Sequence, residues 1–116
     1  MQIKIRTKNI DLTVSLKSFI NNKLGVLKKL MGEDVSDILV DVERQTNHHK
    51  KGDVYWTEAN VNLDGKKLFA KAHGDDVFKT ILEVKEELER EIKRYKTKAI
   101  DLARRNQRKA HEEIEN

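Results

Sequence analysis

Residues 77–98 have the pattern of a long helix that is buried on one side only. Ile81, Val84, Leu88 and Ile92 recur every three or four residues, which places their side chains on one face of an α-helix. From position 90 onward the opposite side is mainly basic. A helix of this kind needs a second layer to cover its apolar face, so we expect it to pack on a sheet and to leave its cations in water.

Positive charge is concentrated at the end of this helix. Eight Lys or Arg residues and a single acid, Asp101, lie between Lys93 and Lys109, a formal charge of +7 against +4 for the whole chain. Cations along a helix can follow a phosphate backbone and release its condensed counterions. The alternative is a solvated helix with internal ion pairs, which the glutamates at 86, 87, 89 and 91 favour for its first turns. Because acids are scarce after Lys93, we favour polyanion binding.

The rest of the chain predicts one further helix and a sheet. Thr13 is the expected N-cap of a helix that ends at Gly32. Asp64-Gly65 is typical of a tight hairpin, and Asp75 or Asp76 is expected to cap the last helix. Strands are expected where apolar and polar side chains alternate, at residues 2–6, 35–43, 55–63 and 68–73.

This order, β-α-β-β-β-α, predicts an α+β fold: a four-stranded, mostly antiparallel sheet with two helices packed on one face. One domain is expected at residues 1–98. Residues 99–116 are expected to form a charged C-terminal helical extension or tail. The helix should continue through Ile100 and Leu102, and beyond Arg104 it should fray, because those residues bury almost nothing.

Several classes of site are not expected. The absence of cysteine excludes disulfides, cysteine nucleophiles and thiolate metal ligands, and it fits a reducing compartment. There is no Gly-rich phosphate loop and no nucleophile beside a recognisable base, so we expect neither an enzyme nor a cofactor. His48 and His49 are adjacent and diverge on an extended backbone, so no metal site is expected. No apolar run resembles a signal or a membrane span, and the expected location is cytoplasmic.

Other residues leave two interpretations open. Trp56 and Phe69 fall on the sheet face that no helix covers, where they can stack on bases or pack against each other across strands. Lys23 projects from the apolar face of the first helix, either reaching past its neighbours to water or joining the cations of the last helix. Lys50 and Lys51 lie in a polar loop that either faces phosphates or is simply solvated.

Two segments carry a resemblance to a known family. Leu88 to Lys98 is similar almost letter for letter to a second-helix signature, and residues 70–78, Ala-Lys-Ala-His-Gly-Asp-Asp-Val-Phe, are similar to a strand-to-helix junction. Gln2-Ile3-Lys4-Ile5 and Lys23-Leu24 also agree. On these residues the chain resembles the ribosome hibernation promoting factor family, also called ribosome-associated inhibitor A or light-repressed protein, over about its first 98 residues.

The resemblance implies a double-stranded-RNA-binding-like α+β fold that sits in the channel of the small ribosomal subunit. It would contact rRNA there, exclude mRNA and tRNA, and silence translation without chemistry. The family's basic contacts, carried over position by position, fall on Lys23, Arg90, Arg94, Lys96 and Lys98. Lys93 is added from the helix geometry alone, and further candidate RNA contacts are Lys50, Lys51, Arg104 and Arg105.

The sequence departs from the family pattern in two positions and in length. Leu82 stands where the family commonly has an acid, and Glu87 stands where it has a lysine, so one phosphate contact is missing. A chain ending at Asn116 is expected to be a short form that is monomeric when free, without the dimerisation domain of long members. The competing interpretations are a general RNA-binding or RNA-chaperone module, and a protein-interaction adaptor that uses the uncovered sheet face. No small-molecule substrate and no membrane partner are expected.

Overall fold

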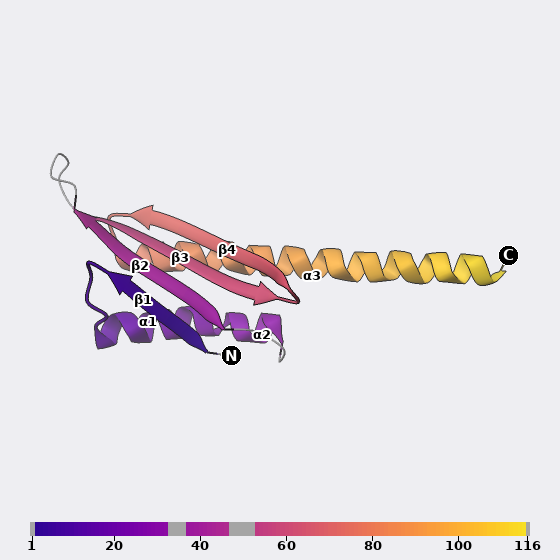
Figure 1. Ribbon diagram of the computed structural model, residues 1–116, viewed down its shortest axis with the longest axis horizontal. Helices are drawn as coiled ribbons and strands as arrows, with labels where there is room; N and C mark the ends of the chain where they lie inside the picture. The colour runs from indigo at the N-terminus through magenta and orange to yellow at the C-terminus, as the bar shows by residue number, and fades with distance from the viewer. Residues whose placement is uncertain (1, 33–36, 47–52, 116) are drawn as a thin grey trace.

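The computed structural model describes residues 2–32, 37–46 and 53–115, with side chains at all of these except 53 and 110–115. Two short helices and a long one accompany a sheet (Figure 1). The elements are β1 (Ile3–Lys8), α1 (Val14–Gly25), α2 (Leu27–Met31), β2 (Ile38–Thr46), β3 (Asp53–Leu63), β4 (Lys66–Gly74) and α3 (Val77–Glu115).

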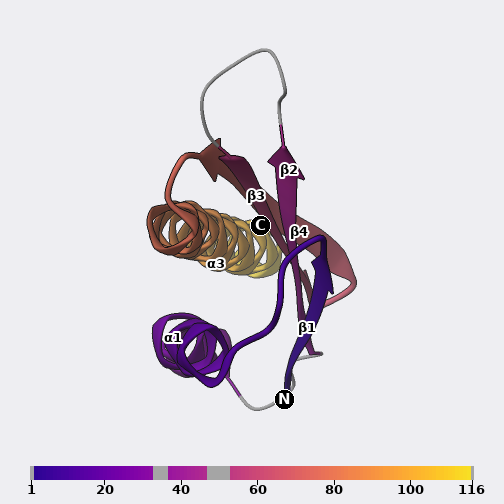
Figure 2. The ribbon, with the colours of Figure 1, turned by 90° about the vertical axis from the view of Figure 1, so that its left-hand side faces the viewer.

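The sheet is four-stranded and mixed. Its order is β1-β2-β3-β4, with β1 parallel to β2 and the other neighbours antiparallel. Parallel neighbours need a crossover connection, which α1 and α2 supply. Figure 2 shows α1 and α3 on the same face of the sheet, so none of the helices that the structure describes covers the other face. The predicted α+β class and the four-stranded sheet are therefore confirmed.

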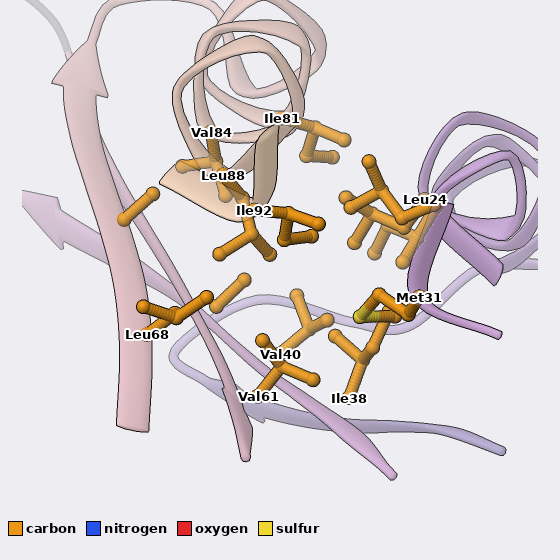
Figure 3. Packing of buried hydrophobic residues seen from close by; sticks show 14 of the residues in the cluster. Leu24, Met31, Ile38, Val40, Val61, Leu68, Ile81, Val84, Leu88 and Ile92 are labelled. Atoms are coloured by element: carbon orange, nitrogen blue, oxygen red, sulfur yellow. The ribbon is translucent and has the colours of Figure 1, made fainter. Parts of the chain in front are cut away.

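The core lies between the helices and the covered sheet face (Figure 3). Ile81, Val84, Leu88 and Ile92 on α3 are each 0% exposed, as their helical spacing predicted. They meet α1 and α2 on one side and inward-facing strand residues on the other. These partners include Leu24, Met31, Ile38, Val40, Val61 and Leu68.

The first helix is interrupted, which corrects the prediction of a single helix ending at Gly32. The backbone N–H of Val26 donates to the carbonyl of Leu24 instead of to a residue four positions earlier. Gly25, a poor helix former, immediately precedes this break. Leu24 and Leu27 are both fully buried, so the segments before and after the break serve the same core. Gly32, at φ 86°, ends α2.

Local signals in the sequence fix the ends of several elements. Thr13 caps α1, because its Oγ1 accepts a hydrogen bond of 3.1 Å from the N–H three residues later. Asp76, rather than Asp75, caps α3 through a 2.9 Å bond from the N–H two residues later. Asp64 and Gly65 have φ values of 54° and 82°, the pair of left-handed conformations that a two-residue I′ hairpin requires.

Helix α3 continues far beyond the sheet (Figure 1). It is one uninterrupted helix of 39 residues, and residues 97–109 are all exposed. The fraying expected after Arg104 is therefore not seen. The physical reason is that the buried part of α3 already supplies the helix nucleus, and residues 96–115 contain no Gly or Pro and many strong helix formers. The division between residues 1–98 and 99–116 stays a prediction.

Candidate nucleic-acid interface

Packing of α3 on the sheet determines where its cations point. Leu88 and Ile92 are fully buried, whereas Arg90, Lys93 and Arg94 between and beside them are exposed. Because a helix turns by about 100° per residue, anchoring its apolar side holds these basic side chains outward. The predicted separation of an apolar side from a basic side is confirmed.

Three of the predicted cations form a row along α3. Arg90, Arg94 and Lys98 are spaced four residues apart and follow one ridge of the helix. We call these three residues the α3 ridge. Lys96, which is half-buried, comes five full turns after Phe78 and therefore leaves the helix on the side that Phe78 presents to α1. The predicted cations thus occupy more than one face of α3.

Neighbouring glutamates pair with two of the predicted cations. Lys93 Nζ lies 3.3 Å from Glu89, and Arg94 lies 3.2 Å from Glu91. Lys93 and Arg94 remain 61% and 62% exposed, and ion pairs between such exposed groups contribute at most about 1 kcal/mol. A phosphate can therefore replace either glutamate at little cost. Arg90, Lys96 and Lys98 form no ion pair with any residue that the structure describes.

Glu89 connects two lysines and stays ionised. It accepts from Lys85 at 3.0 Å and from Lys93, and these hydrogen bonds, the one from Lys85 first, lower the pKa of its carboxyl group. Arg90 borders a groove of about 390 Å³ between β4 and α3, which is also lined by Glu83, Glu86 and Glu87. Positive charge along α3 is therefore partly compensated around Arg90 and increases toward Lys98 and beyond.

Lys23 lies near the start of α3. Its Nζ is 5.7 Å from the centroid of the Phe19 ring, and that ring packs edge-to-face on Phe78 at 4.9 Å. Phe78 precedes Arg94 by sixteen residues, or about 24 Å along the helix. Lys23 is exposed and available to a ligand, and it lies over Phe19, the residue through which α1 contacts the first turn of α3.

The remaining candidates divide into two groups. Arg104 and Arg105 are exposed on the part of α3 that extends past the sheet. Lys50 and Lys51, with His48 and His49, lie outside the described residues, so their roles stay predictions.

On the uncovered sheet face, Trp56 and Phe69 do not pack against each other. Trp56 stacks on His73, its cross-strand partner, with ring centroids 4.7 Å apart and an interplanar angle of 23°. Phe69 faces Asn60 across the strands and is 55% exposed. One face of the Trp56 indole is therefore occupied, while Phe69 remains open to a partner. Sequence patterning did not identify His73, although the hairpin register would have paired it with Trp56.

Acids on β2 and just before it pair with the cations of β1 on the same face. Arg6 binds Asp41 through two hydrogen bonds of 2.7 and 3.0 Å, and Asp41 raises the pKa of the guanidinium group. Lys4 lies 3.1 Å from Asp37 in the same way. The uncovered face thus carries balanced charge, in contrast to the outer side of α3.

Tyr95 is a positioning residue that the sequence did not single out. Its hydroxyl lies 3.4 Å from Asp64 Oδ2 at the β3–β4 turn, and burial followed by the charge of Asp64 raises the pKa of this hydroxyl. The contact joins α3 to the end of the sheet between Arg94 and Lys98. It adds to the packing of the buried Ile92 in holding the helix where it leaves the domain.

Within residues 2–32, 37–46 and 53–115, no cluster of His, Cys, Asp and Glu is arranged to hold a metal ion. None of the helices described in these ranges is long and apolar enough to cross a membrane.

Comparison with known proteins identifies the family. A family model described as sigma 54 modulation protein / S30EA ribosomal protein matches residues 3–100, which is most of the chain. The chain belongs to this family. The chain is similar to a ribosome hibernation promotion factor of Bacillus subtilis (strain 168), 30% identical over 98 residues that cover 84% of this chain and 50% of that protein. The resemblance to hibernation promoting factors is therefore confirmed.

Other similar proteins show how the chain compares in length and fold. A ribosome hibernation promoting factor of Acinetobacter guillouiae is 27% identical over 105 residues, covering 87% of this chain and 92% of that one. The chain spans about half the length of the relatives from Bacillus subtilis and Lactococcus lactis. The solved structure of a ribosomal subunit interface protein from Coxiella burnetii aligns with a TM-score of 0.65 at 25% identity, over 84% of this chain and 99% of that one.

Proposed function

We propose that this protein binds the small ribosomal subunit, occupies the path of mRNA and tRNA, and silences translation by steric exclusion. The observation that carries the proposal is the α3 ridge, a row of exposed cations on a rigidly packed helix in a member of this family. The names of relatives, ribosome hibernation factor and ribosomal subunit interface protein, support the same target. The protein would act where ribosomes are, in the cytoplasm, and as a monomer.

The proposed contacts are electrostatic. Arg90, Arg94 and Lys98 would bind rRNA phosphates along one line, with Lys93 beside this line and Lys96 on another face of the helix. Lys23 would reach a separate segment of rRNA beside the start of α3. The resemblance of the fold to double-stranded-RNA-binding domains is part of this proposal and agrees with recognition of folded RNA by shape and backbone.

Binding to small subunits is expected to weaken steeply as salt rises. If six cations each neutralise one phosphate, the logarithm of the binding constant should fall with the logarithm of salt concentration with a slope of roughly −4 to −5. The measurement is co-sedimentation of the purified protein with isolated small subunits at several salt concentrations, together with inhibition of translation in vitro.

The same assay separates the alternatives. A general RNA-binding or chaperone module would bind arbitrary duplex RNA as tightly as it binds small subunits. An adaptor that uses Phe69 and the uncovered sheet face would retain a protein partner after nuclease treatment and would not sediment with subunits. Either result, or a binding constant that is independent of salt, would exclude the proposed function.

A further inference from the structure

The cationic ridge of α3 is repeated on the free part of the helix. At about 100° per residue, Arg108 lies five full turns after Arg90 and points the same way. Arg105 lies eleven positions after Arg94, and Lys109 lies eleven positions after Lys98. Eleven residues make close to three turns, so each of these side chains points within about 20° of the ridge residue that it follows. We call Arg105, Arg108 and Lys109 the distal set; all three are exposed.

The helix fixes the spacing of the two sets. Their centres are thirteen residues apart, or about 20 Å along a continuous helix. The Tyr95 contact with Asp64 ties this helix to the sheet just before Lys98, so the distal set is held in a defined direction from the domain. Asp101 is the single acid between the two sets.

The exposed apolar residues of the extension do not suit a protein partner. Ile100 and Leu102 are 53% and 59% exposed, but two residues of separation place them about 200° apart around the helix. They therefore cannot form the continuous seam that a coiled coil or a helix-binding groove needs. Residues 99–109 carry four cations and one acid, so this stretch is complementary to a polyanion, and the acids Glu112, Glu113 and Glu115 follow it.

We propose that the distal set is a second RNA-binding segment, held rigidly by α3 so that the protein grips two stretches of phosphodiester backbone about 20 Å apart on folded RNA. The inference rests on the proposed function, because the first stretch is the rRNA bound by the α3 ridge. Once the ridge is bound, the distal set meets its own stretch at a high effective concentration, and overall affinity rises without any new fold.

Two variants of the full chain test this inference on purified small subunits. Changing Arg105, Arg108 and Lys109 to Gln should weaken binding by 10-fold to 100-fold and reduce the magnitude of the salt slope by roughly 2 to 3. Ala103→Pro keeps every charge but breaks the helix between the two sets, and it should weaken binding by at least 5-fold, with the domain intact by circular dichroism. A matched control changes Lys66, Lys67 and Lys71, exposed on β4, to Gln.

Each outcome has a defined meaning. Wild-type binding by the distal Gln variant would overturn the inference, and so would equal losses in that variant and in the β4 control. Wild-type binding by Ala103→Pro would also overturn it, since the cations would then act as a flexible tail. These failures would leave the proposed function standing as long as substitution of the α3 ridge abolishes binding, so the two proposals fail separately.

Discussion

Reversing the charge of Arg90, Arg94 and Lys98 to Glu should reduce affinity for small ribosomal subunits on the order of 1,000-fold and abolish inhibition of translation. Hydrogen bonds to charged groups contribute about 1.5 kcal/mol or more each, so losing three removes on the order of 4 kcal/mol. Repulsion between the new carboxylates and phosphates adds to this loss. All three side chains are exposed, so the fold should be preserved. Co-sedimentation and an in vitro translation assay provide the measurement.

A matched reversal separates the ridge from net charge. Changing Lys28, Lys66 and Lys67, all exposed and outside α3, to Glu alters the net charge equally. We expect that variant to lose no more than about 10-fold, through the weaker long-range field. Equal losses in both variants would show that total charge, and not the α3 ridge, determines binding. Normal binding after reversal of the ridge would exclude the ridge as the contact.

Leu88→Ala should lower the free energy of unfolding by about 2 to 5 kcal/mol, because Leu88 is fully buried and its truncation leaves a cavity where α3 meets the sheet. For a domain of this size that is a large part of the total stability. Urea denaturation followed by circular dichroism measures the change.

The same helix offers a control for this substitution. Leu102→Ala makes the same chemical change at a side chain that is 59% exposed beyond the sheet, and it should alter stability by less than about 0.5 kcal/mol. If Leu88→Ala were as mild as Leu102→Ala, α3 would not be packed on the sheet as described. The outward orientation of the ridge would then lose its physical basis.

Periodicity in the sequence was enough to find the faces of the fold. The spacing of Ile81, Val84, Leu88 and Ile92 identified the buried side of α3, because a helix with one apolar face buries that face against the core. The break at Val26 was missed, since apolar spacing continues through it from Leu24 to Leu27 and shows no change of pattern. The end of α3 is harder to predict, because burial stops near Tyr95 whereas intrinsic propensity sustains the helix beyond Arg104.

The candidate site was only partly predictable for a different reason. Charge content located the cations, but pairing depends on side-chain geometry, which joined Lys93 to Glu89 and Arg94 to Glu91. The stacking of Trp56 on His73 depended on the register of two strands rather than on either residue alone. The assignment of five cations to rRNA rests on family resemblance and that of Lys93 on helix geometry, and all of these assignments stay predictions.

The most direct test of the central claim is photocrosslinking of the protein to purified small ribosomal subunits from two positions. A photoreactive residue replacing Thr97, which is exposed on the cationic side of α3 between Arg94 and Lys98, should crosslink to rRNA that lines the mRNA and tRNA channel. The same residue replacing Phe69 on the uncovered sheet face should crosslink several-fold less. Absence of rRNA crosslinks from position 97, or stronger crosslinks from position 69, would contradict the account.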